Sequence, residues 1–138
     1  LQTYLGGLEK AVAINGAIDG NKAASARDHL RDLIRALLRQ YREAGNTHKL
    51  LTFELPVLPA DQQAELRAAE RRIMARFDVA LAAAATEAGR TTPLDGPRAM
   101  MLFGTLNWTY TWFREDGTLS LDAYCELVTD STIASLLA

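Results

Sequence analysis

Apolar residues recur along this chain at the spacing of a helix and not at the alternation of a strand. Residues three or four apart share one face of a helix, so each apolar stretch predicts one helix. The expected helices cover residues 2–18, 25–44, 47–55, 59–88, 97–113 and 120–137, with Gly, Pro or Asp-Gly turns between them. We therefore expect an all-α fold, an antiparallel helical bundle of about six helices joined by short loops.

The helix expected over residues 25–44 has the clearest pattern. Ser25 is a favourable N-cap, and Asp28 lies near the positive end of the helix dipole. One face is apolar, with Leu30, Leu33, Ile34, Leu37, Leu38 and Tyr41. The other carries Arg27, Arg31, Arg35, Arg39 and Arg42, among which Asp28, Asp32 and Glu43 are interleaved. Mixed charge of this kind predicts a solvated face and not a phosphate-binding surface.

The helix expected over residues 59–88 is the longest and would span about 40 Å. Its inner stripe consists of Leu66, Ala69, Ile73, Phe77, Ala80 and Ala84, widened by Met74 and Leu81. Phe53, Met74, Phe77, Leu81 and Met101 are adaptable residues of the kind that line a cavity for an apolar ligand. The same residue types fill ordinary cores, so an apolar pocket stays one of two interpretations.

The helix expected over residues 97–113 has no polar side. One face carries Met101, Gly104, Thr105, Trp108 and Trp112, and another carries Met100, Phe103, Asn107 and Tyr110. A helix that is apolar all round must be covered all round. We expect its own domain to cover one face and a second copy of the chain to cover the other. The alternative is that both tryptophans fill the core of a single chain.

The last expected helix offers a matching surface, because Ser131, Ala134, Ser135 and Ala138 alternate with larger residues. Two helices from each copy would form a four-helix dimer interface with two-fold symmetry. The residues expected in this homodimer interface are Gly104, Thr105, Trp108, Trp112, Leu127 and Ala134.

Composition narrows the class of protein. The chain has 138 residues, 49% of them hydrophobic and 23% charged, which predicts one ordinary globular domain. The net charge of −2 gives no drive toward DNA or anionic membranes. No apolar run approaches the roughly 20 residues of a membrane span. A single cysteine, Cys125, excludes an internal disulfide and fits a reducing cytoplasm.

Signatures of catalysis and of metal or cofactor binding are missing from the sequence. His29 and His48 lie in charged or polar surroundings, which favours structural or surface roles. Cys125 belongs to an apolar helix and is expected to be a buried, inert thiol. We expect no catalytic residue, no metal and no cofactor. Two other interpretations stay open: a small helical enzyme using Tyr41, Glu54 and Asn107, and a helical interaction module without a pocket.

The stretch LFGTLNWTYTWFREDGTLSLDAYCELVTDSTIASLL, residues 102–137, resembles the C-terminal end of TetR-family transcriptional regulators. Many members carry L-x-G-x-x-N-W-x-x-x-W, a D-G-x-L-S loop and a last amphipathic helix. The matching positions are Leu102, Gly104, Asn107, Trp108 and Trp112, then Asp116, Gly117, Leu119 and Ser120. RDHLRDLIRALLRQYRE and HKLLTFELPVLPADQQAELRAAERR also resemble the family's middle helices, so the similarity covers nearly the whole chain.

This resemblance implies an effector-binding and homodimerisation domain whose last two helices form the dimer interface. A pocket for a small hydrophobic effector would lie among the first five helices. The resemblance implies a cytoplasmic repressor that the ligand releases from DNA, and not an enzyme. The family's helix-turn-helix precedes this domain and is missing here. We therefore expect residues 1–138 to form a single domain that reaches DNA only through a missing N-terminal domain.

Overall fold

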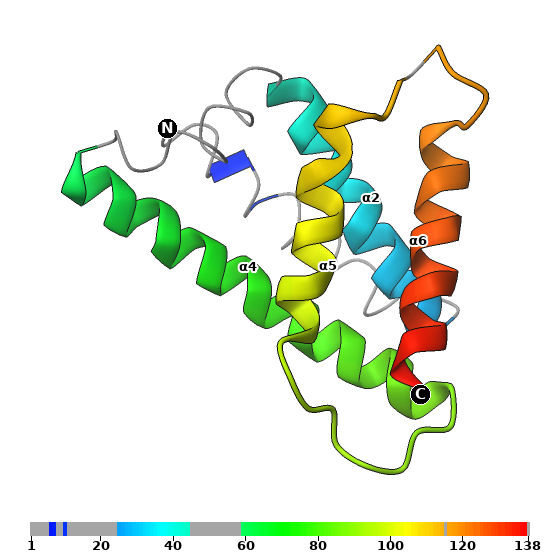
Figure 1. The fold of residues 1–138 in the computed structure, drawn as a ribbon. Coiled ribbons are helices and arrows are strands. Elements are labelled where there is room, and N and C mark those ends of the chain that lie inside the picture. Colours follow the sequence, from blue (N-terminus) through cyan, green and yellow to red (C-terminus); the bar gives the residue numbers. More distant parts are fainter. Residues whose placement is uncertain (1–5, 8–9, 11–24, 45–58, 115, 138) are drawn as a thin grey trace.

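The computed structural model describes residues 6–7, 10, 25–44, 59–114 and 116–137 (Figure 1). Within these residues the chain is helical and has no strand, so the predicted all-α class is confirmed. The helices are α2 (Ala26–Ala44), α4 (Ala60–Glu87), α5 (Arg98–Asn107) and α6 (Leu121–Leu136), and a 3₁₀ helix, η2 (Trp108–Thr111), continues α5. The helices expected over residues 2–18 and 47–55 lie outside the described residues, apart from residues 6–7 and 10.

The core forms where α2, α4 and α6 meet. Helix α2 packs against both α4 and α6, while α5 packs on α4 (Figure 1). Helices α5 and α6 run in opposite directions, and α6 is also antiparallel to α2. None of the described helices is both long and apolar enough to cross a membrane.

Helix α2 begins and packs as its sequence predicts. The Ser25 hydroxyl accepts a hydrogen bond of 3.0 Å from the Asp28 N–H, as an N-cap should. All six apolar residues of the expected face are buried, and none is more than 8% exposed. Burying a large apolar side chain contributes roughly 1.5–3 kcal/mol, so this face anchors the core.

Helix α4 is about 42 Å long at 1.5 Å per residue. Every residue of its predicted inner stripe is buried, as is Leu81. The helix ends at Glu87, and two residues later Gly89 has a φ of 108°, in the left-handed region that favours glycine. The Arg90 N–H then donates to the Ala85 carbonyl at 2.9 Å, which closes the helix in a Schellman-like turn.

Helix α5 is shorter than the predicted helix over residues 97–113. After Asn107 the backbone tightens into η2. Two threonine hydroxyls donate hydrogen bonds to the backbone carbonyls three residues earlier. The Thr109 hydroxyl lies 2.7 Å from the Leu106 carbonyl oxygen, and the Thr111 hydroxyl lies 2.6 Å from the Trp108 carbonyl oxygen. Such local bonds compete with the α-helical ladder, which is a physical reason for the change.

Both ends of α6 are capped by side chains. The Ser120 hydroxyl accepts from the Ala123 N–H at 3.1 Å, which confirms the predicted N-cap. The last turn of α6 has no basic residue of its own. Arg90 donates to the Leu136 carbonyl at 2.7 Å and Arg98 to the Ser135 carbonyl at 3.0 Å. These guanidinium groups place positive charge at the negative end of the helix dipole.

Candidate functional site

Helices α5 and α6, with η2, present an exposed apolar face. Met101 is 63% exposed, Trp108 55%, Trp112 48% and Leu127 55%. Gly104, Thr105 and Ala134 are exposed as well. The six residues expected in a dimer interface are thus all accessible in a single chain. The alternative in which both tryptophans fill the monomer core is wrong, because about half of each residue faces solvent.

A groove of about 330 Å³ lies between α5 and α6. Buried side chains line its base: Leu81, Leu102, Tyr124, Val128 and Leu136. Its rim carries Met101 and Thr105 from α5, and Leu127, Ser131 and Ser135 from α6. Arg98 is the one charged residue among its lining residues, and its guanidinium is engaged by Asp95 and the Ser135 carbonyl. The groove therefore suits an uncharged, apolar helix surface.

Aromatic contacts hold one end of this face in place. The Trp112 ring meets the Tyr124 ring edge-on with centroids 5.1 Å apart, and Phe113 lies 5.6 Å from Tyr124. The Arg42 guanidinium lies over Phe113 at 5.3 Å from the ring centroid. These contacts join the end of η2 to α6 and α2, so Trp112 is exposed but not loosely held.

The residues predicted to line an effector pocket fall on two sides of the fold. Phe77 and Leu81 are wholly buried, and Met74 packs against the same core. Phe77 meets Phe103 of α5 edge-on at 5.2 Å between ring centroids. Met101 instead lies on the exposed face, where it lines the α5–α6 groove with Leu81. Phe53 lies outside the described residues.

The polar residues considered for catalysis do not converge. Tyr41 is buried in the core, while Glu54 and His48 lie outside the described residues. The Asn107 Oδ1 is buried and has no hydrogen-bond partner. Cys125 is fully buried as predicted, and burial raises the pKa of its thiol, which disfavours the nucleophilic thiolate. Among the described residues, no three His, Cys, Asp or Glu side chains come together as a metal site.

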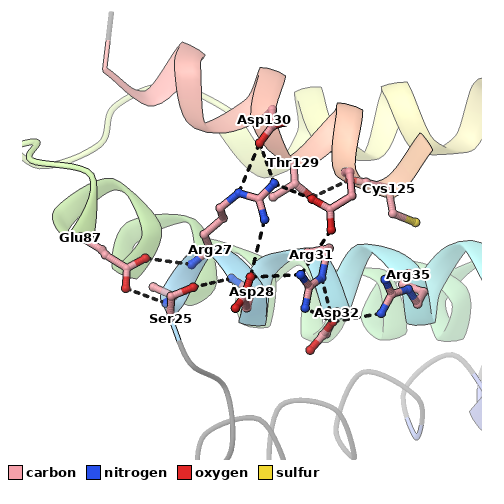
Figure 2. A network of polar contacts seen from close by, with 12 residues as sticks. Ser25, Arg27, Asp28, Arg31, Asp32, Arg35, Glu87, Cys125, Thr129 and Asp130 are labelled. Atoms are coloured by element: carbon pink, nitrogen blue, oxygen red, sulfur yellow. Dashed lines mark hydrogen bonds and ion pairs between the residues drawn. The ribbon is translucent and has the colours of Figure 1, made fainter. Parts of the chain in front are cut away.

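The prediction of a solvated arginine face on α2 is wrong for three of its arginines. Arg27, Arg31 and Arg35 pair with acidic residues of α6 in a polar network that we call the charge ladder. Figure 2 shows its part around Arg27 and Asp130. Its pairs are Arg27 with Asp130 (2.6 Å) and Glu126 (2.7 Å), Arg31 with Glu126 (3.3 Å), and Arg35 with Asp122 (3.0 Å). The three arginine side chains are only 23–30% exposed.

The ladder could have been found in the sequence, because residues 27, 31 and 35 and residues 122, 126 and 130 share a spacing of four. Within α2, Asp28 and Asp32 bridge successive arginines. Hydrogen bonds to Asp130 and Glu126 raise the pKa of Arg27, and the Arg27 hydrogen bond lowers the pKa of Glu126. The ladder therefore joins α6 to α2, and its Arg27–Glu126 pair favours the charged form of both partners.

These features define a class of protein. It is an all-helical domain whose last helix forms ion pairs with another helix of the same chain on one side, while a mostly apolar face of two helices stays exposed on the other. The model of the family described as "Tetracyclin repressor-like, C-terminal domain" matches residues 23–136. The chain belongs to this family. Its members are transcriptional regulators and not enzymes, so the interpretation as a helical enzyme is set aside.

Two solved structures share the fold. A TetR-family transcriptional regulator from Bordetella parapertussis superposes with a TM-score of 0.75 at 24% sequence identity, covering 95% of this chain and 68% of that one. The TetR-family transcriptional regulator PfmR from Thermus thermophilus gives a TM-score of 0.77 at 18% identity, covering 96% and 70%. No curated protein matches the chain. Family membership supports a regulatory role in ligand binding and dimerisation.

Proposed function

We propose that this chain is the effector-sensing and homodimerisation unit of a TetR-like repressor that a small hydrophobic ligand releases from DNA. The observation that carries the proposal is the exposed, mostly apolar face of α5 and α6, with the groove between them. DNA would be contacted by a separate N-terminal domain of the regulator, as the family resemblance implies.

Dimerisation is supported by the chemistry of this face. Two tryptophans and Met101 are about half exposed or more on it, together with Leu127. Contiguous apolar surface of this kind marks interaction sites, and interface centres are enriched in aromatic residues and Met and depleted in charge. A face made from two antiparallel helices can pair with its own copy about a two-fold axis, giving four helices at the interface.

Effector binding is supported by the other side of α5. Phe103 faces Phe77, and Met74 packs nearby against the same core. Asn107 follows Phe103 by one helical turn and carries the buried oxygen without a partner. A polarisable apolar surface with one unpaired acceptor is suited to a mainly hydrophobic ligand that donates one hydrogen bond.

Release from DNA would follow from a shift of populations. A ligand changes the balance between two conformations of the dimer only if it binds one of them more tightly. Coupling of about 1–3 kcal/mol would change operator affinity roughly 5- to 150-fold.

Sedimentation velocity tests the dimer. We expect a species of twice the 15.1 kDa chain mass at micromolar concentrations. A chain that keeps the mass of one copy up to the highest soluble concentration would contradict the proposal.

Native mass spectrometry of gently purified protein tests the effector. We expect a bound organic molecule that Met74→Trp excludes by filling the pocket, while the dimer persists. Val79→Trp, at an exposed position of α4, is the matched control and should retain the molecule. Protein that carries no small molecule and binds none of a panel of apolar compounds would favour an interaction module without a pocket.

A further inference from the structure

Arg27 joins the first turn of α2 to two acidic residues of α6. Its Nη2 lies 2.6 Å from Asp130 Oδ1 and 2.7 Å from Glu126 Oε2, and its Nε lies 3.3 Å from the same Asp130 oxygen (Figure 2). Planar guanidinium groups hold carboxylates in a defined orientation, which a flexible ammonium does not. Arg27 therefore fixes the orientation of α6 as well as its distance.

The backbone of the same turn is held by a third helix. Glu87, the last residue of α4, accepts hydrogen bonds from the Ala26 N–H (2.9 Å) and the Arg27 N–H (3.0 Å). The first N–H groups of a helix have no partner within it, and a carboxylate there is favoured by the helix dipole. Residue 27 is thus anchored through both its backbone and its side chain.

The acidic residues that Arg27 binds are next to residues of the open face. Leu127 follows Glu126, and Ser131 follows Asp130; both line the α5–α6 groove. Glu126 and Asp130 are one turn apart, so holding both on one side fixes the rotation of α6 about its axis. The direction in which Leu127 and Ser131 project then depends on Arg27.

We propose that Arg27 couples the first turn of α2 to the dimerisation face of α6. Displacement of this first helical turn, where the chain enters α2 at Ser25, weakens the dimer. Dimer formation conversely stabilises the position of this first helical turn. The inference rests on the proposed function, because it takes the α5–α6 face as the dimer interface. Linkage makes the effect reciprocal: what the turn does to the dimer, the dimer does to the turn.

The dimer dissociation constant, measured by sedimentation equilibrium, gives the first test. We expect Arg27→Met to weaken the dimer roughly tenfold, toward the lower end of allosteric coupling because the ion pairs are partly solvated. Arg39→Met removes the same charge from an exposed position of α2 and is the matched control, expected to leave the constant within about twofold of the parent. Arg27→Lys keeps the charge without the planar fork and should weaken the dimer by an intermediate factor.

Hydrogen exchange gives a readout that a merely structural role would not change. The Ala26 and Arg27 amides should exchange more slowly in the dimer than in diluted monomer. This difference should disappear in Arg27→Met, while the Arg39→Met control retains it.

The outcomes separate the two proposals. A parent that does not dimerise overturns the proposed function. A parent dimer that Arg27→Met and Arg39→Met affect equally, with unchanged exchange, overturns the coupling alone. If the circular dichroism of Arg27→Met shows that this variant has lost its helices, the test passes to Arg27→Lys. An Arg27→Lys dimer with the same dissociation constant as the parent dimer then overturns the coupling.

Discussion

Helices α2 and α5 are both rich in large apolar residues, yet the fold treats them differently. In α2 the apolar residues share one face and every one of that face is buried. In α5, Leu102 and Leu106 are buried, whereas Met100 and Met101 stay more than half exposed. The apolar residues of α2 fit one stripe that a single core can cover, but those of α5 extend around the helix.

A single chain can cover the whole apolar face of α2 but only part of the apolar surface of α5. Helix α2 contacts α4 with its apolar face and α6 with its charge ladder, so its apolar face and three of its arginines have partners within the chain. Helix α5 contacts α4 and leaves its far side open. The contrast predicts that changes in the buried apolar face of α2 alter folding, while changes on the open side of α5 alter association.

The largest expected effect is a loss of folding stability from a change in the buried face of α2. Leu37 is 0% exposed, so Leu37→Ala leaves a cavity and should lower the free energy of unfolding by about 2–5 kcal/mol. Urea denaturation monitored by circular dichroism measures this. Met101→Ala is the control on the open face and should change the unfolding of the monomer by less than about 0.5 kcal/mol. Equal losses in the two variants would contradict the comparison.

The next effect breaks the α5 side. Trp108→Glu places a charge on the proposed interface and should weaken the dimer about 100-fold, equivalent to roughly 2.7 kcal/mol, with helicity largely retained. Sedimentation equilibrium and circular dichroism together measure it. Val79→Glu alters an apolar residue that is 72% exposed but belongs to α4 and not to the α5–α6 face, and it should leave the dimer intact. A dimer that tolerates the Trp108 change would rule out this face.

A smaller effect sharpens the view that α2 is satisfied within the chain. Ser25→Ala removes the acceptor of the Asp28 N–H and should lower the free energy of unfolding by about 1 kcal/mol. Ser25→Asp keeps an N-cap acceptor and should retain most of the stability. Urea titrations of both variants below the dissociation constant isolate the monomer. A Ser25→Ala variant as stable as the parent would refute the cap's contribution.

The smallest effect concerns the charged rung at Glu126. Its pKa is lowered in the folded chain, first by the Arg27 hydrogen bond, so its stabilisation is present above its unfolded pKa and is lost as pH falls through the folded pKa. At neutral pH Glu126→Gln should cost less than about 1 kcal/mol, because the pair is partly solvated. The urea midpoints of parent and variant should converge only as the pH falls through this lowered pKa, below the ordinary range of a glutamate. A gap that persists in acid would assign the loss to packing and not to charge.

The sequence predicted the parts of the fold that depend on one helix at a time. The stripes of α2 and α4 and the hydroxyl caps at Ser25 and Ser120 are confirmed, because burial and capping follow from local spacing. The end of α5 was misplaced, since the hydroxyls of Thr109 and Thr111 take carbonyls from the α-helical ladder. The helix propensities of these residues do not predict that competition, because it depends on the backbone geometry.

Features that require two helices were harder to predict. The arginines of α2 looked solvated because acidic residues alternate with them on the same helix, and only the matching spacing on α6 identifies their partners. The exposed face could be predicted because a helix that is apolar on all sides must be buried on all sides, and its own domain covers only one of them. The predicted pocket rests on residue type, and residue type does not separate Phe77 in the core from Met101 on the surface.

The segment from Glu87 to Arg98 secures the start of one helix and the end of another. Glu87 holds the first amides of α2, while Arg90 and Arg98 hold the last carbonyls of α6. Connections between helices are ordinarily where a protein best accepts inserted peptides or circular permutation. Here that freedom should belong to the exposed turn at Asp116–Gly117, and an epitope grafted between Arg90 and Arg98 should loosen α6 as well as α5.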